Sequence, residues 1–360
     1  MKSLNPHDIT LLETIISKAT ETVIVTHMKP DGDAIGSSTA LYHFLKKAGK
    51  EKVQIVINDP APRTLDFLVG TIPQHDLIIC SCDSMAASAA IAGADTIFCL
   101  DFNAFHRTDL LGPMLESANA QKVLIDHHLY PDTESFDLIF SETEISSASE
   151  LLYHILMALS TVGENAESLP KETATALLTG MTTDTNNFAN SVYPSTLIMT
   201  SKLLAAGTDR DYILDRLFNQ HSESRLRLMG HMMKDLLTIT EDGVAYIVLD
   251  KKTQVEYNVQ EGDTEGFVNM PLSIASVRMS LLLKEDEDRI RVSIRSRKGT
   301  SANACARAYF NGGGHECAAG GRLHIPINEA TAYIEHYTHL YFTENGIGSC
   351  NCGRCCHTVA

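Results

Sequence analysis

The sequence lacks long apolar runs, since none reaches the roughly 18 consecutive apolar residues that a membrane-spanning helix needs. Residues 1–6 lead into an amphipathic helical pattern, which is unlike the apolar core of a signal peptide. Internal repeats and low-complexity tracts are also missing. We therefore expect a cytoplasmic protein with no membrane partner.

Basic residues are scarce in this chain. The 29 Lys and Arg stand against 45 Asp and Glu, which gives a formal net charge of -16. A protein that binds long duplex nucleic acid needs clustered Lys and Arg to neutralise the phosphates, so we expect no such partner. A small or short phosphorylated substrate remains open, because bound cations can supply the positive charge that the side chains lack.

Paired cysteine spacings are absent over most of the chain. Five of the nine cysteines are scattered as reduced thiols would be: Cys80, Cys82, Cys99, Cys305 and Cys317. The other four crowd the tail, at Cys350, Cys352, Cys355 and Cys356. We expect residues 347–360 to be a disordered tail, with a zinc or copper clip as the alternative.

What is present is an alternation of strand-like and helical patterns. Apolar runs predict strands over residues 21–26, 53–57, 77–80, 95–100 and 121–125, and helices over 9–18, 34–48 and 83–92. Such alternation is typical of a doubly wound, mainly parallel sheet with helices on both faces. The fold class is therefore α/β, and the 360 residues allow a second domain.

In the second half of the chain the spacing of the apolar residues changes. Residues 146–218 look helical, and from 238 onward strand patterns return over 245–249, 273–283 and 289–296, followed by a helix over 302–309, a glycine loop, a last strand and a helix. We predict a catalytic domain over 1–192, a helical connector over 193–235 and a smaller α+β domain over 236–346.

Ionisable side chains follow three of the predicted strands. His27, Asp31 and Asp33 come after the first strand, Asp101 follows the fourth, and Asp126-His127-His128 follows the fifth. Ligands of open α/β sheets bind outside the carboxyl ends of the strands, so these side chains should meet. His127 and His128 point to opposite sides if the backbone stays extended.

Further polar residues extend this set. Asp184 ends a helical pattern, and its alternative role is a simple helix cap. Asn103 and Arg107 lie close to Asp101 in the sequence, and the guanidinium of Arg107 would bind phosphate oxygens, unless it forms a surface salt bridge.

The imidazoles and carboxylates together suit divalent cations. Mixed nitrogen and oxygen ligands favour Mn²⁺, with Mg²⁺ or Co²⁺ as alternatives. Two such cations roughly 3.5 to 4 Å apart would activate a bridging hydroxide and bind a phosphoryl oxygen, which is phosphoester hydrolysis. The candidate metal ligands are His27, Asp31, Asp33, Asp101, His127 and Asp184.

These motifs, in this order, resemble the DHH phosphoesterase superfamily with its DHH-associated C-terminal domain. The second domain adds the segments 295–299, 310–315 and 318–320, and with 265–269 the chain looks most like the branch of bifunctional oligoribonucleases and pAp phosphatases. The resemblance implies that His27 and Asp31 hold one cation, that Asp33, His127 and Asp184 hold the other, and that Asp101 bridges them. It also implies catalytic roles for His128 and Arg107 beside the scissile phosphate.

The glycine segment of the second domain has its own interpretation. Glycines let backbone N–H groups approach a phosphate, although a flexible turn is the alternative. Asn311 replaces a glycine that the family commonly has, and Asn tolerates a positive φ. The predicted substrate-binding residues are Asn103, Arg107, Arg295, Arg297, Gly312, Gly313, Gly314 and His315.

The leading hypothesis is hydrolysis of short single-stranded RNA to mononucleotides and of pAp to AMP. A phosphodiesterase of cyclic or linear dinucleotides, a pyrophosphatase or an exopolyphosphatase would use the same metal core. A nucleotide-binding module without activity is disfavoured, because every expected ligand and His128 are present. The oligomeric state, including a homodimer, stays open.

Overall fold

The computed structural model describes residues 4–260 and 262–346, and the chain divides into two compact units, Met1–Gln220 and His221–Ala360. We call them the N-terminal and the C-terminal unit. Their boundary falls inside the segment 193–235, so the helices predicted there are shared between the units. The cysteine-rich segment 347–360 lies outside the described residues.

The N-terminal unit contains a six-stranded sheet in the order β3-β2-β1-β4-β5-β6, and every neighbouring pair is parallel. This confirms the doubly wound α/β fold. Only β6 of this sheet was not predicted. The strands are β1 (Glu21–Thr26), β2 (Lys52–Ile57), β3 (Leu77–Ile79), β4 (Thr96–Leu100), β5 (Gln121–Asp126) and β6 (Leu138–Ser141).

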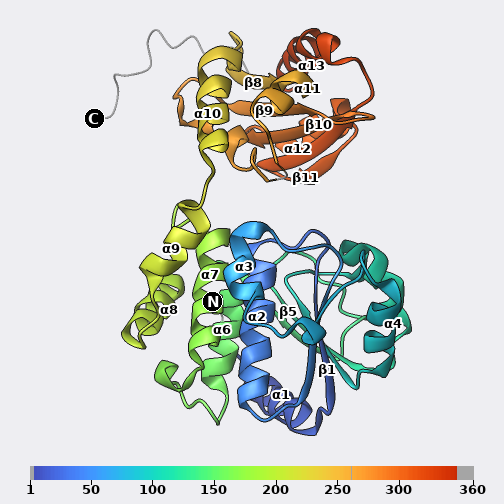
Figure 1. Cartoon of the computed structure of the whole chain (residues 1–360), viewed down its shortest axis with the longest axis vertical. Coiled ribbons are helices and arrows are strands. Elements are labelled where there is room, and N and C mark those ends of the chain that lie inside the picture. The colour runs from blue at the N-terminus through green and yellow to red at the C-terminus, as the bar shows by residue number, and fades with distance from the viewer. Residues whose placement is uncertain (1–3, 261, 347–360) are drawn as a thin grey trace. The chain divides into compact units, whose positions relative to one another are not determined.

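Both faces of this sheet are covered because successive strand residues point to opposite sides. Ile24 packs into a core with one set of helices, whereas Val23 and Val25 pack into a second core with another. The first set comprises α1 (Pro6–Lys18), α2 (Gly32–Lys47), α6 (Ala148–Ala158), α7 (Lys171–Asp184), α8 (Pro194–Ala205) and α9 (Arg210–Phe218), and the second α4 (Ser84–Gly93) and α5 (Gly112–Ser117) (Figure 1).

Helices α2 and α7 cross at unusually close range. A Cβ on Gly36 would lie 2.7 Å from the Cα of Gly180, so only glycine fits on α2 at this point. The start of α2 is equally close to the end of α7, since a Cβ on Gly32 would lie 2.3 Å from Oγ1 of Thr183. This contact brings the neighbouring Asp184 to the strand ends.

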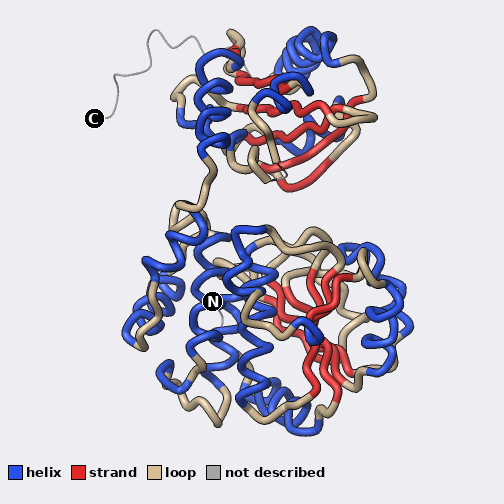
Figure 2. The backbone as a smooth tube through the Cα atoms, in the orientation of Figure 1, coloured by secondary structure: helices blue, strands red, loops and turns tan. Residues whose placement is uncertain are grey.

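The C-terminal unit is the α+β domain that the sequence predicts (Figure 2). Its sheet has the order β11-β12-β10-β9-β8-β7, antiparallel except for the pair β8 and β9. The elements are α10 (Glu223–His231), β7 (Thr238–Ile239), β8 (Val244–Leu249), α11 (Lys251–Glu256), β9 (Met279–Glu285), β10 (Ile290–Ser296), α12 (Ala302–Tyr309), β11 (Gly313–His315), β12 (Ala318–Leu323) and α13 (Ala330–Glu344).

Two local predictions for this unit are wrong. The strand expected from residue 273 begins only at Met279, because Ser273 ends a 3-10 helix (Phe267–Ser273) and the N–H of Val277 then donates to the carbonyl of Ile274 in a turn. Gly313 and Gly314 of the predicted glycine loop belong to the edge strand β11, and a Cβ on Gly312, just before this strand, would lie 1.9 Å from the carbonyl oxygen of Gly320. The glycines therefore permit close strand packing.

Within the described residues, no helix has the length and apolarity needed to cross a bilayer. The five cysteines that the structure describes are free thiols.

Candidate metal centre

The carboxyl ends of β1, β4 and β5 meet at the centre of the sheet, where the strand order reverses between β1 and β4. Such a reversal leaves a crevice above the strand ends, because the helical connections leave in opposite directions. Among the described residues, three overlapping groups of side chains there have ligand atoms within 4.8 Å of one another. The groups are His27, Asp31 and Asp101; Asp33, His127 and Asp184; and Asp101, His127 and His128.

His27 is oriented by its own backbone. Its Nδ1 lies 2.8 Å from the carbonyl oxygen of Met28, so in the neutral ring Nδ1 carries the proton and Nε2 is the ligand atom. Nε2 lies 3.4 Å from Oδ2 of Asp101 and 3.7 Å from Oδ1 of Asp31. A ring nitrogen held by a carbonyl on one side, with carboxylates on the other, is the usual arrangement of a metal-binding histidine.

His127 forms the corresponding centre of the second group. Its Nε2 lies 3.4 Å from Oδ1 of Asp101, 3.6 Å from Oδ2 of Asp184 and 4.0 Å from Oδ2 of Asp33. Asp101 therefore presents one oxygen to each histidine, with Oδ2 toward His27 and Oδ1 toward His127.

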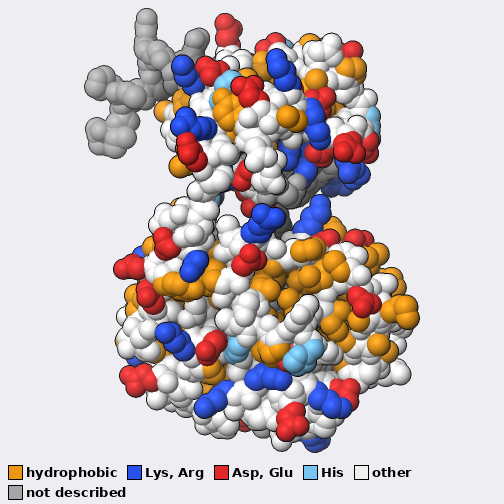
Figure 3. All heavy atoms as spheres, viewed as in Figure 1, with side chains coloured by type: hydrophobic (Ala, Val, Ile, Leu, Met, Phe, Trp, Pro, Cys, Tyr) orange, Lys and Arg blue, Asp and Glu red, His pale blue; other side chains and the backbone are white. Residues whose placement is uncertain are grey.

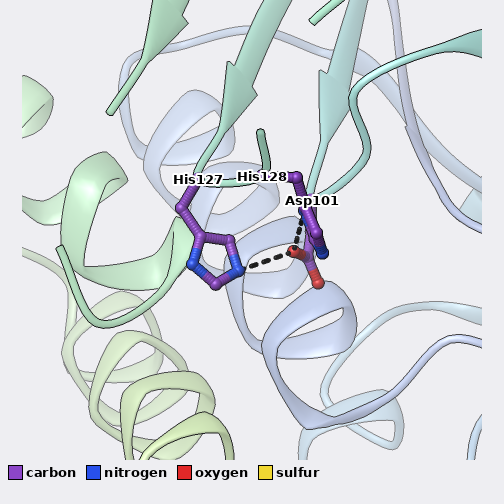
Figure 4. A group of neighbouring side chains, drawn as sticks. All are labelled: Asp101, His127 and His128. Atoms are coloured by element: carbon purple, nitrogen blue, oxygen red, sulfur yellow. Dashed lines mark ion pairs between the residues drawn. The ribbon is translucent and has the colours of Figure 1, made fainter. Parts of the chain in front are cut away.

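Asp101 links the two groups, because it belongs to the group of His27 and Asp31 and its Oδ1 lies 3.4 Å from Nε2 of His127 in the other. Its side chain is buried, and its φ of 63° lies in the left-handed region that an aspartate adopts only at a cost. The buried Oδ1 has no hydrogen-bond partner. Figure 4 shows His127 and His128 both directed at this carboxylate. A buried, strained and incompletely bonded carboxylate is a strong indication of a bound cation.

Asp31 caps α2, and Asp33 lies in its first turn. One expectation about backbone conformation is corrected by the structure. His127 and His128 do not diverge, because β5 ends at Asp126 and their ring centroids lie 4.7 Å apart. The condition of an extended backbone is therefore not met.

The helix termini give these carboxylates additional partners. Oδ1 of Asp31 accepts hydrogen bonds from the N–H groups of Asp33 and Ala34. Asp33 accepts the N–H groups of Ala148 and Ser149 at the start of α6, at 2.6 and 2.9 Å. These bonds fix the carboxylates in place, since helix N-termini attract negative charge.

The crowding of carboxylates is visible in their pKa values. Burial raises the pKa of Asp33 well above its usual range, and the charges of Asp101 and Asp184 add to this. Burial is the main cause that raises the pKa of Asp184 to about 6; the charges of His127 and His128 oppose it, and those of Asp101 and Asp31 add to it. Carboxylates that repel one another in this way fit cations, which would relieve the repulsion.

Asp184 is the last residue of α7, next to its C-cap Thr185. A carboxylate there meets the negative end of the helix dipole, which is unfavourable in the absence of a positive partner. Its position opposite His127 therefore favours a ligand role over the alternative of a simple cap.

Asp126 contacts the candidate residue His128, although no role was predicted for it from the sequence. It is fully buried. Its carboxylate accepts a hydrogen bond from Nδ1 of His128 at 2.7 Å and another from the backbone N–H of His128 at 3.1 Å. The pair fixes the tautomer and the ring orientation of His128. The signal was available, since Asp126 directly precedes the two histidines.

Asn58 and Asp59, at the end of β2, were also overlooked. Oδ1 of Asn58 accepts the N–H of Leu110, and Oδ2 of Asp59 accepts the N–H of Lys29. These bonds hold the segments that carry His27 and Arg107. The same signal of polar residues after an apolar run could have found them.

Arg107 lies in the 3-10 helix Phe105–Leu111, and its carbonyl oxygen accepts the N–H of Met28, next to His27. Within the described part of the chain, no carboxylate forms a salt bridge with its guanidinium, so the alternative of a surface salt bridge is not seen. Asn103 donates from Nδ2 to the carbonyl of Leu129 at 2.7 Å, which joins the segment after Asp101 to the segment after His128.

The candidate residues of the C-terminal unit have varied surroundings. Arg295 is half-buried on β10 and donates to the carbonyl of Ile294, and burial lowers the pKa of its guanidinium. Arg297 donates to the carbonyls of Leu272 and Ile274, so part of its guanidinium holds the end of the 3-10 helix.

The glycine segment uses several of its N–H groups internally. The N–H of Gly312 donates to the carbonyl of Ala306, and the N–H of Gly314 donates to Oδ1 of Asn303. Neither N–H group can therefore bind a phosphate in this conformation. Asn311 adopts a φ of 46°, as expected for a residue that stands in for glycine. The backbone of Gly313 and His315 lies in β11. Their contact with substrate stays a prediction.

Comparison with known proteins identifies matches over most of the chain. Residues 21–181 match the family model described as "DHH family, N-terminal domain", and residues 241–339 match the DHHA1 domain. The chain is 31% identical to the bifunctional oligoribonuclease and PAP phosphatase NrnA of Thermus thermophilus, with 83% of each chain covered. It is 28% identical to the protein of the same name from Bacillus subtilis, over 90% of this chain and 94% of that one.

A solved structure is also similar to this chain. The crystal structure of an exopolyphosphatase-related protein from Bacteroides fragilis superposes with a TM-score of 0.89 at 36% identity. The match covers 96% of this chain and 99% of that one.

Proposed function

Since this chain belongs to the DHH phosphoesterase family, we propose that it hydrolyses short oligoribonucleotides to mononucleotides and pAp to AMP. The chain is a hydrolase of phosphoester bonds; the proposal concerns its substrates and mechanism. The observation that carries it is the position of Asp101, which is grouped with His27 and Asp31 and also lies 3.4 Å from Nε2 of His127, a member of the group with Asp33 and Asp184. Relatives named as oligoribonucleases and PAP phosphatases support the choice of substrate.

We assign His27 and Asp31 to one divalent cation, Asp33, His127 and Asp184 to a second, and Asp101 to both. The distances from His27 and His127 to opposite oxygens of Asp101 support this division. Mn²⁺ is the proposed metal, because imidazole nitrogen and carboxylate oxygen suit it. When bound, the pair would supply a nucleophile from water at neutral pH and neutralise charge on the phosphate.

The remaining residues act on the substrate directly. His128, held by Asp126, would donate a proton to the leaving oxygen from Nε2, because its Nδ1 is engaged by Asp126. Arg107 would bind a phosphate oxygen of the substrate through its guanidinium. Asn103 would support this arrangement by fixing the segment that follows His128.

We assign Arg295, Arg297 and the segment from Gly312 to His315 to substrate binding in the C-terminal unit. Arg295 supports this best, because a half-buried guanidinium gains from an anionic partner. The bonds of Arg297 to Leu272 and Ile274 make its contribution partly structural.

The surface of the protein favours short substrates. Figure 3 shows acidic side chains interspersed with the basic ones on the visible face of each unit. With a net charge of -16, a long polyanion would be repelled. We also propose action in the reducing cytoplasm, which the free cysteines support.

The test is a substrate panel with the full chain. Cation-depleted protein should release mononucleotides from di- to pentaribonucleotides, and AMP from pAp, once Mn²⁺ is restored. Asp101→Asn should reduce turnover by at least about 100-fold, whereas Asp211→Asn, an exposed change on α9, should not reduce it.

The panel also contains the competing substrates. An exopolyphosphatase, pyrophosphatase or cyclic-dinucleotide phosphodiesterase would use the same cations, and the similarity to an exopolyphosphatase-related protein makes polyphosphate a necessary comparison. Activity on polyphosphate or pyrophosphate without release of mononucleotides would overturn the proposal.

A further inference from the structure

Two apolar side chains project into solvent directly after the histidine pair. The exposed fraction is 61% for Leu129 and 88% for Tyr130. Isolated apolar residues are common on protein surfaces. This pair differs in its position, because it follows His127 and His128 on the loop that leaves β5.

The loop that carries the pair is held beside the metal centre. Nδ2 of Asn103 donates to the carbonyl of Leu129 at 2.7 Å, and the N–H of Asp132 donates to the carbonyl of Asn103 at 2.8 Å. Asn103 is two residues from Asp101, so these bonds join the two segments that supply Asp101 and His128. Tyr130 therefore lies on a fixed rim of the site.

The backbone of Tyr130 supports a specific role for its ring. Its φ is 60°, in the left-handed region that bulky residues rarely adopt and that Gly or Asn enters more easily. An aromatic residue at such a position gains nothing for the turn itself. Within the described part of the chain, its ring also stacks on no other aromatic ring, so both of its faces can be used.

Exposed apolar side chains occur on other segments around the centre as well. Met28 follows His27 and is 45% exposed, and Leu110 follows Arg107 by three residues and is 49% exposed. The N–H of Met28 donates to the carbonyl of Arg107, which joins these two segments. The rim of a site that binds only inorganic phosphate would gain nothing from such side chains.

We propose that Tyr130 stacks on a nucleobase of the substrate and thereby selects nucleotides over substrates made of phosphate alone. Every base has a π-face, so an aromatic ring binds bases with little regard to sequence. Leu129 adds apolar contact beside it. The inference rests on the proposed function and deepens it, because it names the group that distinguishes the nucleotide from pyrophosphate.

The experiment compares Tyr130→Ala and Tyr130→Phe on matched substrates. These are a diribonucleotide and two analogues in which either the 5′ or the 3′ residue is abasic. Tyr130→Ala should raise KM for the diribonucleotide on the order of tenfold, with kcat changed far less. Tyr130→Phe should retain most of the wild-type KM, since the ring and not the hydroxyl stacks.

The abasic analogues isolate the base contact. On the analogue that lacks the stacked base, the KM of wild type should approach that of Tyr130→Ala. Met85→Ala, an equally exposed change on α4 (83% exposed), should leave KM for all three substrates at the wild-type value. Melting temperatures of the variants check that the fold is intact.

The possible failures are distinguishable. Suppose that wild type hydrolyses the diribonucleotide. If Tyr130→Ala then has an unchanged KM, or if its KM rises on both abasic analogues as much as on the diribonucleotide, stacking is refuted and the proposed function stands. If wild type hydrolyses pyrophosphate and no nucleotide, both ideas fall.

Discussion

At the scale of single residues, the proton of His128 depends on Asp126. The buried carboxylate accepts hydrogen bonds from Nδ1 and from the backbone N–H of His128. Removal of its charge therefore disturbs the tautomer of His128 without changing a proposed metal ligand. For Asp126→Asn we expect kcat to fall on the order of 100-fold, because that is the contribution of a well-placed general acid. KM and Mn²⁺ affinity should change little. Steady-state kinetics and calorimetric titration measure these quantities.

A double-variant comparison separates this role from a purely structural one. If Asp126 acts through His128, Asp126→Asn should have almost no further effect in a His128→Gln background. Independent, multiplying losses would show that Asp126 contributes in another way.

The pKa of His27 leads to a pH dependence of metal binding. Burial lowers this pKa, but hydrogen bonds and charges of Asp101 and Asp31 outweigh burial and raise it from 6.5 to about 10 in the cation-free protein. Protonated His27 therefore stabilises the cation-free fold below pH 6.5, and this contribution is lost as the pH rises toward 10. A cation requires the neutral imidazole, so it must displace a proton.

We accordingly expect the affinity for Mn²⁺ to rise by roughly tenfold per pH unit for each proton displaced, and to level off as the pH approaches 10, where His27 is already neutral. Calorimetric titration in buffers of different ionisation enthalpy measures both the affinity and the proton release. His128→Gln should keep the slope, because His128 is not among the proposed ligands. A pH-independent affinity without proton release would contradict the assignment of His27.

At the scale of elements, the contact between α2, α6 and α7 determines where Asp33 and Asp184 lie. A Cβ on Gly180 would lie 2.0 Å from Oγ of Ser149 and 2.9 Å from Oδ1 of Asp33. Gly180→Ala should therefore lower the free energy of unfolding by roughly 1–3 kcal/mol, as overpacking does, and weaken Mn²⁺ binding by displacing Asp33. Denaturant unfolding and calorimetry test both effects.

Gly230→Ala is the matched control for this change. Gly230 lies in α10, and an added Cβ would meet no atom within 4 Å, so the substitution should be neutral or stabilising by up to about 1 kcal/mol. Adding Ser149→Ala to Gly180→Ala should recover part of the lost stability. Normal stability and normal Mn²⁺ affinity of Gly180→Ala would show that the helices can move apart.

The elements differ in how well the sequence predicts them. The buried strand Glu21–Thr26 and the helix Ala302–Tyr309 are predicted to the residue, because an apolar run or a helical period dominates each. The strand predicted from residue 273 starts too early, since Ser273 ends a 3-10 helix and β9 begins only at Met279. Gly313–His315 becomes a strand only through pairing with β12, which no local pattern encodes.

The site shows the same division between local and tertiary information. The ligand candidates follow from strand ends, because parallel strands place their carboxyl ends together. The hydrogen bonds from Ala148 and Ser149 to Asp33 join residues more than one hundred positions apart, so the sequence offers no spacing that reveals them. The rim position of Tyr130 likewise depends on the bond between Asn103 and Leu129.

At the scale of the whole molecule, cation binding should stabilise one unit and not the other. Every proposed ligand lies between His27 and Asp184, within the unit that ends at Gln220. A ligand that binds only the folded form stabilises it by about 2.7 kcal/mol at 100 times its Kd. Hydrogen exchange should therefore slow in β1, β4 and β5 when Mn²⁺ is added to the cation-free chain, whereas exchange in β9 and β10 should stay the same.

In Asp101→Asn the Mn²⁺ effect should be largely lost, which ties the protection to the shared carboxylate. Equal protection of both units would mean that they unfold as one cooperative body, and no protection in β1 would refute the metal centre itself.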